Sequence, residues 1–149
     1  MKSIIIILGL PGSGKTTYAN NSLSNSHKIY DDCLFNWYDR QLMEDIINKE
    51  NIVLIDPRFC SLDTFFKYIN KILVHVRPSD MNLIVFQNDL DNARLNLKRS
   101  KIHHIISEDE LIKFYNNYVE LLESMEFKYI CTKINTIHLD VQYERRTNS

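Results

Sequence analysis

Glycine is scarce in this chain of 149 residues, which has three glycines, all between positions 9 and 14. Turns elsewhere must use other residues, and asparagine is the available substitute because it tolerates a left-handed backbone. A cluster of glycines indicates a backbone that other atoms approach too closely for a side chain to fit. The three glycines therefore indicate one short loop whose backbone is approached closely by other atoms.

Disulfides, excess charge of one sign and long apolar runs are also missing. The three cysteines, Cys33, Cys60 and Cys131, are odd in number and widely spaced, so we expect reduced thiols and no metal site. Lys and Arg number 18 against 19 Asp and Glu, which excludes a generally basic surface and allows only local contacts with nucleic acid. The apolar run at 4–8 is too short to span a membrane. We expect a cytoplasmic protein without a membrane partner, encoded by a cell or by a virus or phage that acts in its host.

What the chain does have is a phosphate-binding loop. Gly9-x-x-x-x-Gly14-Lys15-Thr16 matches the loop pattern in full, after a predicted strand at 4–8 and before a segment that can begin a helix. Free amides and the positive end of a helix dipole favour an anion there. Lys15 would reach the β- and γ-phosphates of a nucleotide, and the Thr16 hydroxyl would help to hold Mg²⁺. The loop residues assigned to the nucleotide are Gly9, Pro11, Gly12, Ser13, Gly14, Lys15, Thr16 and Thr17.

Strand and helix patterns alternate along the chain and predict one domain over residues 1–140, followed by a flexible tail at 141–149. Further strands are expected at 27–30, 52–56 and 83–86, and 127–131 and 134–139 offer a last strand or a terminal hairpin. Helical spacing predicts one amphipathic helix from 34 to about 49, a helix after Ser61, another from about 89 to 100, and a long helix opened by the capping box Ser107-x-x-Glu110.

This order, together with the phosphate loop, predicts an α/β fold of the P-loop NTPase type, with a parallel sheet of about five strands and helices on both faces; the Arg-containing lid of this fold is implied by the resemblance described next. Ligands of such sheets gather at the carboxyl ends of the strands. We therefore expect the phosphate loop to share one cleft with the polar residues that follow the other strands, namely Asp31, Asp32, Asp56, Arg94 and Arg99.

Four segments together resemble the kinase domain of phage-type polynucleotide 5′-kinases and their P-loop relatives. They are "IIIILGLPGSGKTTYA", the "YDD" after the second strand, the "LID" that ends the third, and "ARLNLKRS" ahead of a helix with "FYNNYVE". The resemblance spans about residues 1–125. It implies ATP as the donor and the 5′-hydroxyl of a polynucleotide as the acceptor.

The resemblance also assigns roles to individual residues. Asp31 matches the general base for the acceptor hydroxyl, and Asn96-Leu97-Lys98-Arg99 matches a lid motif that brings Arg99 onto the donor phosphates. Arg94 is a second candidate for these phosphates. The alternative for either arginine is a solvated helix face.

The predicted acceptor side contains Asp31, Asp32, Asp56 and Arg58. Either Asp31 or Asp32 is also expected to cap the following helix, Asp56 could instead form a turn with Pro57, and Arg58 could lie at the surface.

Two departures from the family pattern concern the acceptor and the lid. Leu34 stands where relatives carry an arginine for the acceptor's phosphate, and Leu95 replaces an arginine before the lid asparagine. The acceptor is therefore open between a polynucleotide and a nucleoside, nucleotide or other small metabolite. A third possibility is a regulatory module that binds nucleotide without transferring phosphate.

Three aromatic residues after the second strand allow two interpretations. Phe35, Trp37 and Tyr38 could form a stacking platform for a base, but their helical spacing favours packing in the core.

Overall fold

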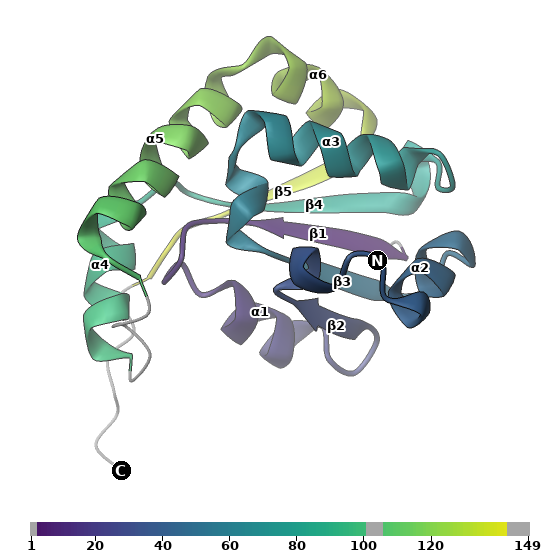
Figure 1. The fold of residues 1–149 in the computed structure, drawn as a ribbon, viewed down its shortest axis with the longest axis horizontal. Helices are drawn as coiled ribbons and strands as arrows, with labels where there is room; N and C mark the ends of the chain where they lie inside the picture. Colours follow the sequence, from purple (N-terminus) through teal and green to yellow (C-terminus); the bar gives the residue numbers. More distant parts are fainter. Residues whose placement is uncertain (1–2, 101–105, 143–149) are drawn as a thin grey trace.

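The computed structural model describes residues 3–100 and 106–142. At its centre lies a five-stranded sheet in the order β2-β3-β1-β4-β5, in which every neighbouring pair of strands is parallel (Figure 1). The strands are β1 (Ile4–Leu8), β2 (Lys28–Asp31), β3 (Ile52–Ile55), β4 (Met81–Phe86) and β5 (Asn135–Leu139). This architecture confirms the predicted parallel α/β sheet.

Helices cover both faces of the sheet. They are α1 (Lys15–Ser22), α2 (Arg40–Ile47), α3 (Leu62–Leu73), α4 (Leu90–Arg99), α5 (Glu108–Glu123) and α6 (Met125–Lys133), and the short 3₁₀ helices are η1 (Cys33–Asn36), η2 (Pro57–Cys60) and η3 (Pro78–Asp80). In Figure 1, α3, α5 and α6 lie above the sheet and α1 lies below it. The sheet is thus the middle layer of three.

Strand β1 is the centre of the core. Its residues alternate between the two faces, so that Ile4 and Ile6 join the larger apolar cluster, while Ile5 and Ile7 join a smaller one with Ala19 of α1. All five residues of β1 are fully buried, as expected for a central strand of a parallel sheet. This burial holds the end of β1, where the phosphate loop begins, at the middle of the sheet's carboxyl edge.

The expected helix from 34 to 49 is wrong as a single element. Residues Cys33–Asn36 form η1, and α2 begins only after Asp39, whose carboxylate accepts hydrogen bonds from the amides of Gln41 and Leu42. This cap starts a new helix. Apolar spacing continues across the break because both pieces pack on the same core.

The expected cap at Asp31 or Asp32 is also wrong. Asp32 precedes η1 with a left-handed φ of 49° and makes no side-chain capping bond, and the Asp31 carboxylate accepts from the amide of Asp32 instead. The helix after Ser61 begins as expected, although the Ser61 side chain makes no capping bond either. Ser107 caps the long helix as expected, because its hydroxyl accepts from the Glu110 amide at 3.1 Å and donates to the Glu110 carboxylate at 3.2 Å.

Residues 127–131 form part of helix α6 and not a strand. Ser124 caps this helix by accepting from the amide of Phe127 at 3.1 Å, and Phe127 packs in the core while Tyr129 is exposed. Aromatic and β-branched composition suggested a strand, but the cap and the packing of one helical face override that preference. Only the segment after α6 becomes a strand, and β5 is parallel to β4, so the hairpin alternative is wrong.

The predicted tail begins inside the packed structure. Val141 is 5% exposed and belongs to the smaller apolar cluster on the α1 face. Residues 143–149, the remainder of that predicted tail, lie outside the described part of the chain.

Helix α5 is tied to the end of β4 by one buried hydrogen bond. The Tyr118 hydroxyl, on a fully buried side chain, donates to the carbonyl oxygen of Phe86 at 2.6 Å. We expect Tyr118→Phe to lower the free energy of unfolding by about 1–3 kcal/mol, because the carbonyl loses a buried donor. Urea denaturation measures this change.

Tyr115→Phe on the same helix is the matched control. The Tyr115 side chain is half-buried and its hydroxyl has no hydrogen bond among the described residues. Equal losses in the two variants would contradict the role assigned to the Tyr118 bond.

Candidate nucleotide-binding and phosphotransfer site

The phosphate loop connects β1 to α1 and depends on a left-handed backbone at two glycines. Gly12 has a φ of 84° and Gly14 a φ of 96°, which side chains strongly disfavour. The amide of Ser13 donates to the carbonyl of Leu10 at 3.0 Å and closes the loop on itself. The loop thus has the tight turn expected from its glycines.

Lys15 lies inside this loop. Its side chain is buried, and Nζ donates to the carbonyl oxygens of Gly9 and Leu10, both at 2.8 Å. Burial lowers the pKa of Lys15 below its ordinary value, whereas the charges of Asp31 and Asp56 act in the opposite direction. The ammonium group is therefore held by the loop's own carbonyls at the start of α1.

Helix α4 packs directly on the loop at Gly12. A Cβ atom on Gly12 would lie 2.5 Å from the carbonyl oxygen of Ala93 and 2.8 Å from Cγ of Leu97. The amide group of Asn96 donates to the carbonyl oxygens of Gly12 and Gln142, both at 3.0 Å. The asparagine of the predicted lid motif thus joins α4, the phosphate loop and the segment after β5.

A cleft of about 510 Å³ opens at the carboxyl edge of the sheet. Its walls combine the phosphate loop, the residues that end β2 and β3, the end of α4 and the start of α5. Among the lining residues are Lys15, Thr16, Asp31, Asp32 and Glu110. The loop and the aspartates of the second strand, distant in sequence, therefore share one cleft.

Asp31 lies beside the first turn of α1. Its carboxylate accepts a hydrogen bond from the Thr16 hydroxyl at 2.7 Å. Partial burial and the neighbouring charge of Asp31 raise the pKa of Asp32 above its ordinary value. The two adjacent carboxyl groups therefore differ in environment, with Asp31 bonded to the loop helix.

The buried Asp56 forms an ion pair with the partly exposed Arg58 at the end of β3. Asp56 is fully buried and accepts from the Arg58 guanidinium at 2.6 and 2.9 Å and from the amides of Arg58 and Leu34. Asp56 also begins η2, with Pro57 as its first residue, so the strand-end turn is present. The roles of Asp56 and Arg58 toward an acceptor stay predictions.

The two arginines of the predicted lid differ in their surroundings. Arg94 forms ion pairs with Glu108 at 2.6 Å and Asp91 at 3.4 Å, and so connects α4 to the start of α5. Arg99 is the last residue of α4 and is half-buried. Residues 101–105 lie outside the described part of the chain. Contact of either arginine with nucleotide phosphates stays a prediction.

The sequence analysis missed the segment after β5. Leu139, Asp140 and Gln142 line a hollow of about 460 Å³ together with Ser13 and Thr17 of the phosphate loop and α1. The available signal was the rule that all parallel strands end at one edge, which applies to β5 as well as to the earlier strands. Of these residues, Gln142 lies in the predicted tail at 141–149, whereas Leu139 and Asp140 lie in the predicted domain without an assigned role.

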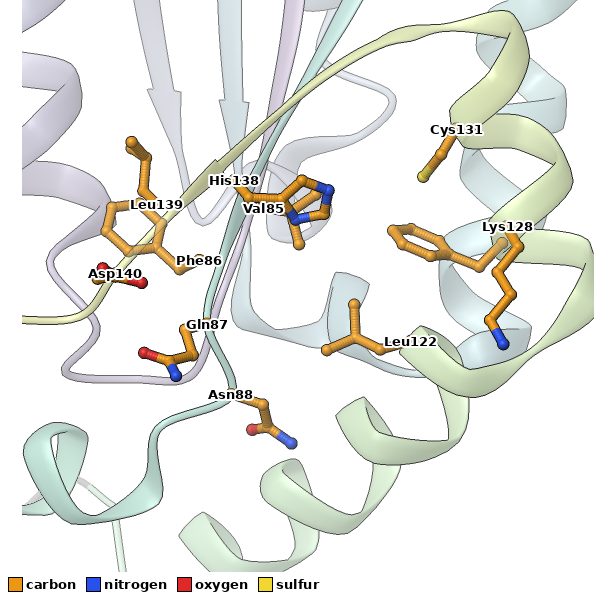
Figure 2. A pocket seen from close by; sticks show the side chains of 11 residues that line it. Val85, Phe86, Gln87, Asn88, Leu122, Lys128, Cys131, His138, Leu139 and Asp140 are labelled. Carbon is orange, nitrogen blue, oxygen red and sulfur yellow. The ribbon is translucent and has the colours of Figure 1, made fainter.

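A further cavity of about 500 Å³ lies between the ends of β4 and β5 and helices α5 and α6. Figure 2 shows the side chains of Val85 and His138, on the strands, facing Cys131 on α6. Lys128 and Asn88 lie at its border (Figure 2). None of the lining residues belongs to the phosphate loop, so this cavity is separate from the cleft.

Residues 3–100 and 106–142 contain no group of three or more His, Cys, Asp and Glu side chains that could hold a metal ion. Mg²⁺ does not need a cluster of this kind, because it uses only one or two carboxylate or hydroxyl oxygens of the protein and keeps several water ligands. The hydroxyl of Thr16 and the carboxylate of Asp31, which lie together in the cleft, are donors of this kind. The residues present therefore fit Mg²⁺.

Within the same part of the chain, no helix has the length and apolar character needed to cross a membrane.

A relative among known proteins decides the family. The chain is 30% identical over 99 residues to "Uncharacterized protein R277" of Acanthamoeba polyphaga mimivirus, a match that covers 65% of this chain and 72% of the relative. The chain belongs to the family of this viral protein. This viral relative is consistent with the expectation of a virus-encoded chain. A scan against models of known protein families finds no match.

Two solved structures show the fold. A gluconokinase from Sinorhizobium meliloti 1021 has a TM-score of 0.57 at 13% identity, and the match covers 94% of this chain and 83% of that one. A shikimate kinase from Bacteroides thetaiotaomicron has a TM-score of 0.52 at 16% identity, with coverage of 95% and 88%. The chain therefore has the fold of P-loop kinases.

Gly12 offers a direct test of how α4 and the loop fit together. We expect Gly12→Ala to lose at least about 1–2 kcal/mol of stability, because its φ is left-handed and the new Cβ would meet the backbone of Ala93. Urea denaturation gives the loss in stability, and titration calorimetry with Mg·ATP gives the accompanying loss in affinity.

Gly9→Ala is the comparison. Its Cβ would also lie close to other atoms, 2.5 Å from the Ser13 hydroxyl oxygen, which can rotate away, and 3.0 and 3.2 Å from the Cβ atoms of Phe86 and Ser13, but none of these is backbone and Gly9 has no positive φ, so we expect a smaller loss. A loss of stability in Gly9→Ala as large as that in Gly12→Ala would contradict the importance of the α4 contact.

Proposed function

We propose that the protein is an ATP-dependent phosphotransferase that moves the γ-phosphate of ATP to an acceptor hydroxyl. The observation that carries the proposal is the position of Asp31, which lines the same cleft as Lys15 and lies 2.7 Å from the Thr16 hydroxyl. A module that only holds a nucleotide needs the loop but needs no carboxylate beside it. The carboxylate therefore favours transfer over binding alone.

In the proposed reaction, the acceptor oxygen bonds to the γ-phosphorus while its proton passes to Asp31. The bond from the γ-phosphorus to its bridging oxygen breaks, and ADP leaves. Such a reaction depends mainly on positioning and on stabilising negative charge. The loop amides and the Lys15 ammonium supply that stabilisation on the donor side.

Mg²⁺ bound with the nucleotide would neutralise phosphate charge. We assign the Thr16 hydroxyl as its protein ligand, with Asp31 beside it. The hydrogen bond from Thr16 to Asp31 keeps these two oxygen groups together.

For the acceptor we favour the 5′-hydroxyl of a polynucleotide, as the four matching segments imply. A second candidate is a small metabolite, because the two structures that share the fold are by name a gluconokinase and a shikimate kinase. Leu34, in place of an arginine for the acceptor's phosphate, is compatible with either acceptor if that acceptor carries no such phosphate. The two candidates differ in size, because the rest of a polynucleotide would extend beyond the cleft and a small metabolite would not.

The test is a transfer assay with γ-labelled ATP, Mg²⁺ and a panel of acceptors. The panel contains 5′-hydroxyl DNA and RNA oligonucleotides, nucleosides, nucleotides, gluconate and shikimate, and Lys15→Ala serves as the inactive control. Label on the oligonucleotides alone supports the favoured acceptor. Label on a small metabolite would show that the acceptor is that metabolite and not a polynucleotide. If the protein binds ATP but labels no acceptor, the remaining interpretation is a regulatory module that binds nucleotide without transferring phosphate.

Asp31 can be tested separately from the fold. We expect Asp31→Asn to bind ATP and to melt near the wild-type temperature while transfer slows by about 10²- to 10⁴-fold, the range for a positioned acid–base group. Asparagine keeps an oxygen that can accept from Thr16 but cannot take the proton. Single-turnover kinetics measure the loss, and Asp32→Asn is the matched control. Near-normal transfer by Asp31→Asn would remove the general-base assignment.

The lid assignment predicts a different pattern at the two arginines. We expect Arg99→Ala to slow transfer far more than it weakens ATP binding, because its charge is needed as the phosphate moves. Arg94→Ala removes ion pairs with Glu108 and Asp91 and should mainly lower stability. Turnover and calorimetry on both variants separate the roles, and loss of turnover in Arg94→Ala alone would reverse them.

A further inference from the structure

Two aromatic rings project from the surface immediately after β2. Phe35 is 75% exposed and Tyr38 is 78% exposed, while Trp37 between them is 3% exposed and belongs to the core. The interpretation of all three as core residues is therefore wrong for Phe35 and Tyr38. Two large rings therefore lie at the surface within four residues of each other, and packing in the core does not explain them.

Trp37 fixes this segment against the rest of the protein. Its ring contacts that of Tyr68 on α3 edge to face, with centroids 4.6 Å apart. The backbone that carries Phe35 and Tyr38 is thus anchored from both sides of Trp37, by η1 before it and by the Asp39 cap of α2 after it. The exposed rings need little further ordering when a ligand binds, which favours affinity.

Each exposed ring has a cation over it. The Arg58 guanidinium lies 4.2 Å from the centroid of Phe35, and Lys71 Nζ lies 5.3 Å from that of Tyr38 and donates to its hydroxyl at 3.0 Å. Arg58 is held in turn by Asp56. We call Phe35, Tyr38, Arg58 and Lys71 the aromatic–cation strip.

The strip begins at the rim of the cleft, on its β2–β3 side. The amide of Phe35 donates to the carbonyl of Asp32 at 3.1 Å, and Asp32 lines the cleft. Pro57, adjacent to Arg58, lines it too. The hollow beside the segment after β5 lies at the opposite end of the sheet order. A chain leaving the cleft on the side of Asp31 would therefore pass over Phe35.

Alternating aromatic rings and cations bind single-stranded nucleic acid. Bases stack on aromatic faces whatever their sequence, and cations bind the phosphates between them. Each stacked base contributes enough for its loss to weaken binding by about 5- to 150-fold. A protein with a net charge of −1 has no wide basic surface, so a short strip of this kind suits a strand end and not a long duplex.

We infer that the aromatic–cation strip holds the first bases of a single-stranded polynucleotide whose 5′-hydroxyl lies beside Asp31. This inference rests on the proposed phosphotransfer and names the part of the acceptor that the cleft itself does not hold. Phe35 stacks the base nearest to the cleft, Tyr38 stacks the next along the strip, and Arg58 and Lys71 bind the intervening phosphates.

The first experiment measures binding without ATP. A short 5′-hydroxyl oligothymidylate with a fluorophore at its 3′ end is titrated with the full chain, and anisotropy gives the affinity. We expect Phe35→Ala and Tyr38→Ala each to bind about 5- to 150-fold more weakly, and Phe35→Trp to retain binding. An oligonucleotide with abasic first positions should bind the wild-type protein as weakly as the alanine variants bind the normal one.

Tyr129→Ala is the matched control. Tyr129 is 63% exposed and has Lys133 5.4 Å from its ring centroid, but it lies on α6 and lines neither the cleft nor its rim. We expect this variant to bind like the wild type. Equal effects of Tyr129→Ala and Phe35→Ala, or no measurable binding of the oligonucleotide by the wild type, would contradict the inference that the aromatic–cation strip binds the polynucleotide.

A second measurement separates this inference from the proposed function. If phosphate reaches no acceptor but the oligonucleotide still binds in a Phe35-dependent way, the strip stands and the phosphotransfer does not. If a small metabolite is phosphorylated and oligonucleotide binding is unaffected by Phe35→Ala, the phosphotransfer stands and the strip does not. For an oligonucleotide acceptor, Phe35→Ala should raise KM with little change in kcat, because the ring lies beyond the reacting atoms.

Discussion

The packing of helix α4 on the bare backbone of Gly12 is the contact on which the candidate site depends. Only a glycine allows both the left-handed φ of this loop residue and the approach of the Ala93 carbonyl. Asn96 adds hydrogen bonds from the same helix to the loop and to residue 142, so the loop, α4 and the segment after β5 form one connected unit. Anything that displaces α4 therefore also changes the surroundings of the phosphate loop.

The proposed acceptor side is organised by a second contact, the ion pair of the buried Asp56 with the partly exposed Arg58. Asp56 is fully buried, so its charge needs the guanidinium and two backbone amides for compensation. One of these amides belongs to Leu34, which ties the segment after β2 to the end of β3. The same ion pair holds the Arg58 guanidinium over the ring of Phe35, so this contact also positions side chains on the surface beyond the cleft.

Much of the fold was predictable because β1, β3 and β4 are short, mostly apolar runs of the kind that a buried parallel sheet accommodates. The phosphate loop was predictable because its glycines, lysine and threonine have one fixed spacing. Helix α6 was not predictable from composition, because its aromatic and β-branched residues favour a strand and only the Ser124 cap and the burial of Phe127 favour the helix. The break before α2 was missed because apolar residues on either side of it face the same core.

The sequence by itself determined the loop that receives phosphates, the parallel sheet and the set of polar residues at its carboxyl edge. These follow from local rules, namely backbone freedom at glycine and the period of apolar residues. Only the tertiary structure decided that Asp31 bonds to Thr16 while Asp56 pairs with Arg58, and that Trp37 is buried between two exposed rings. Such choices depend on which elements meet across the sheet, and contacts between residues distant in the chain leave no periodic trace in the sequence.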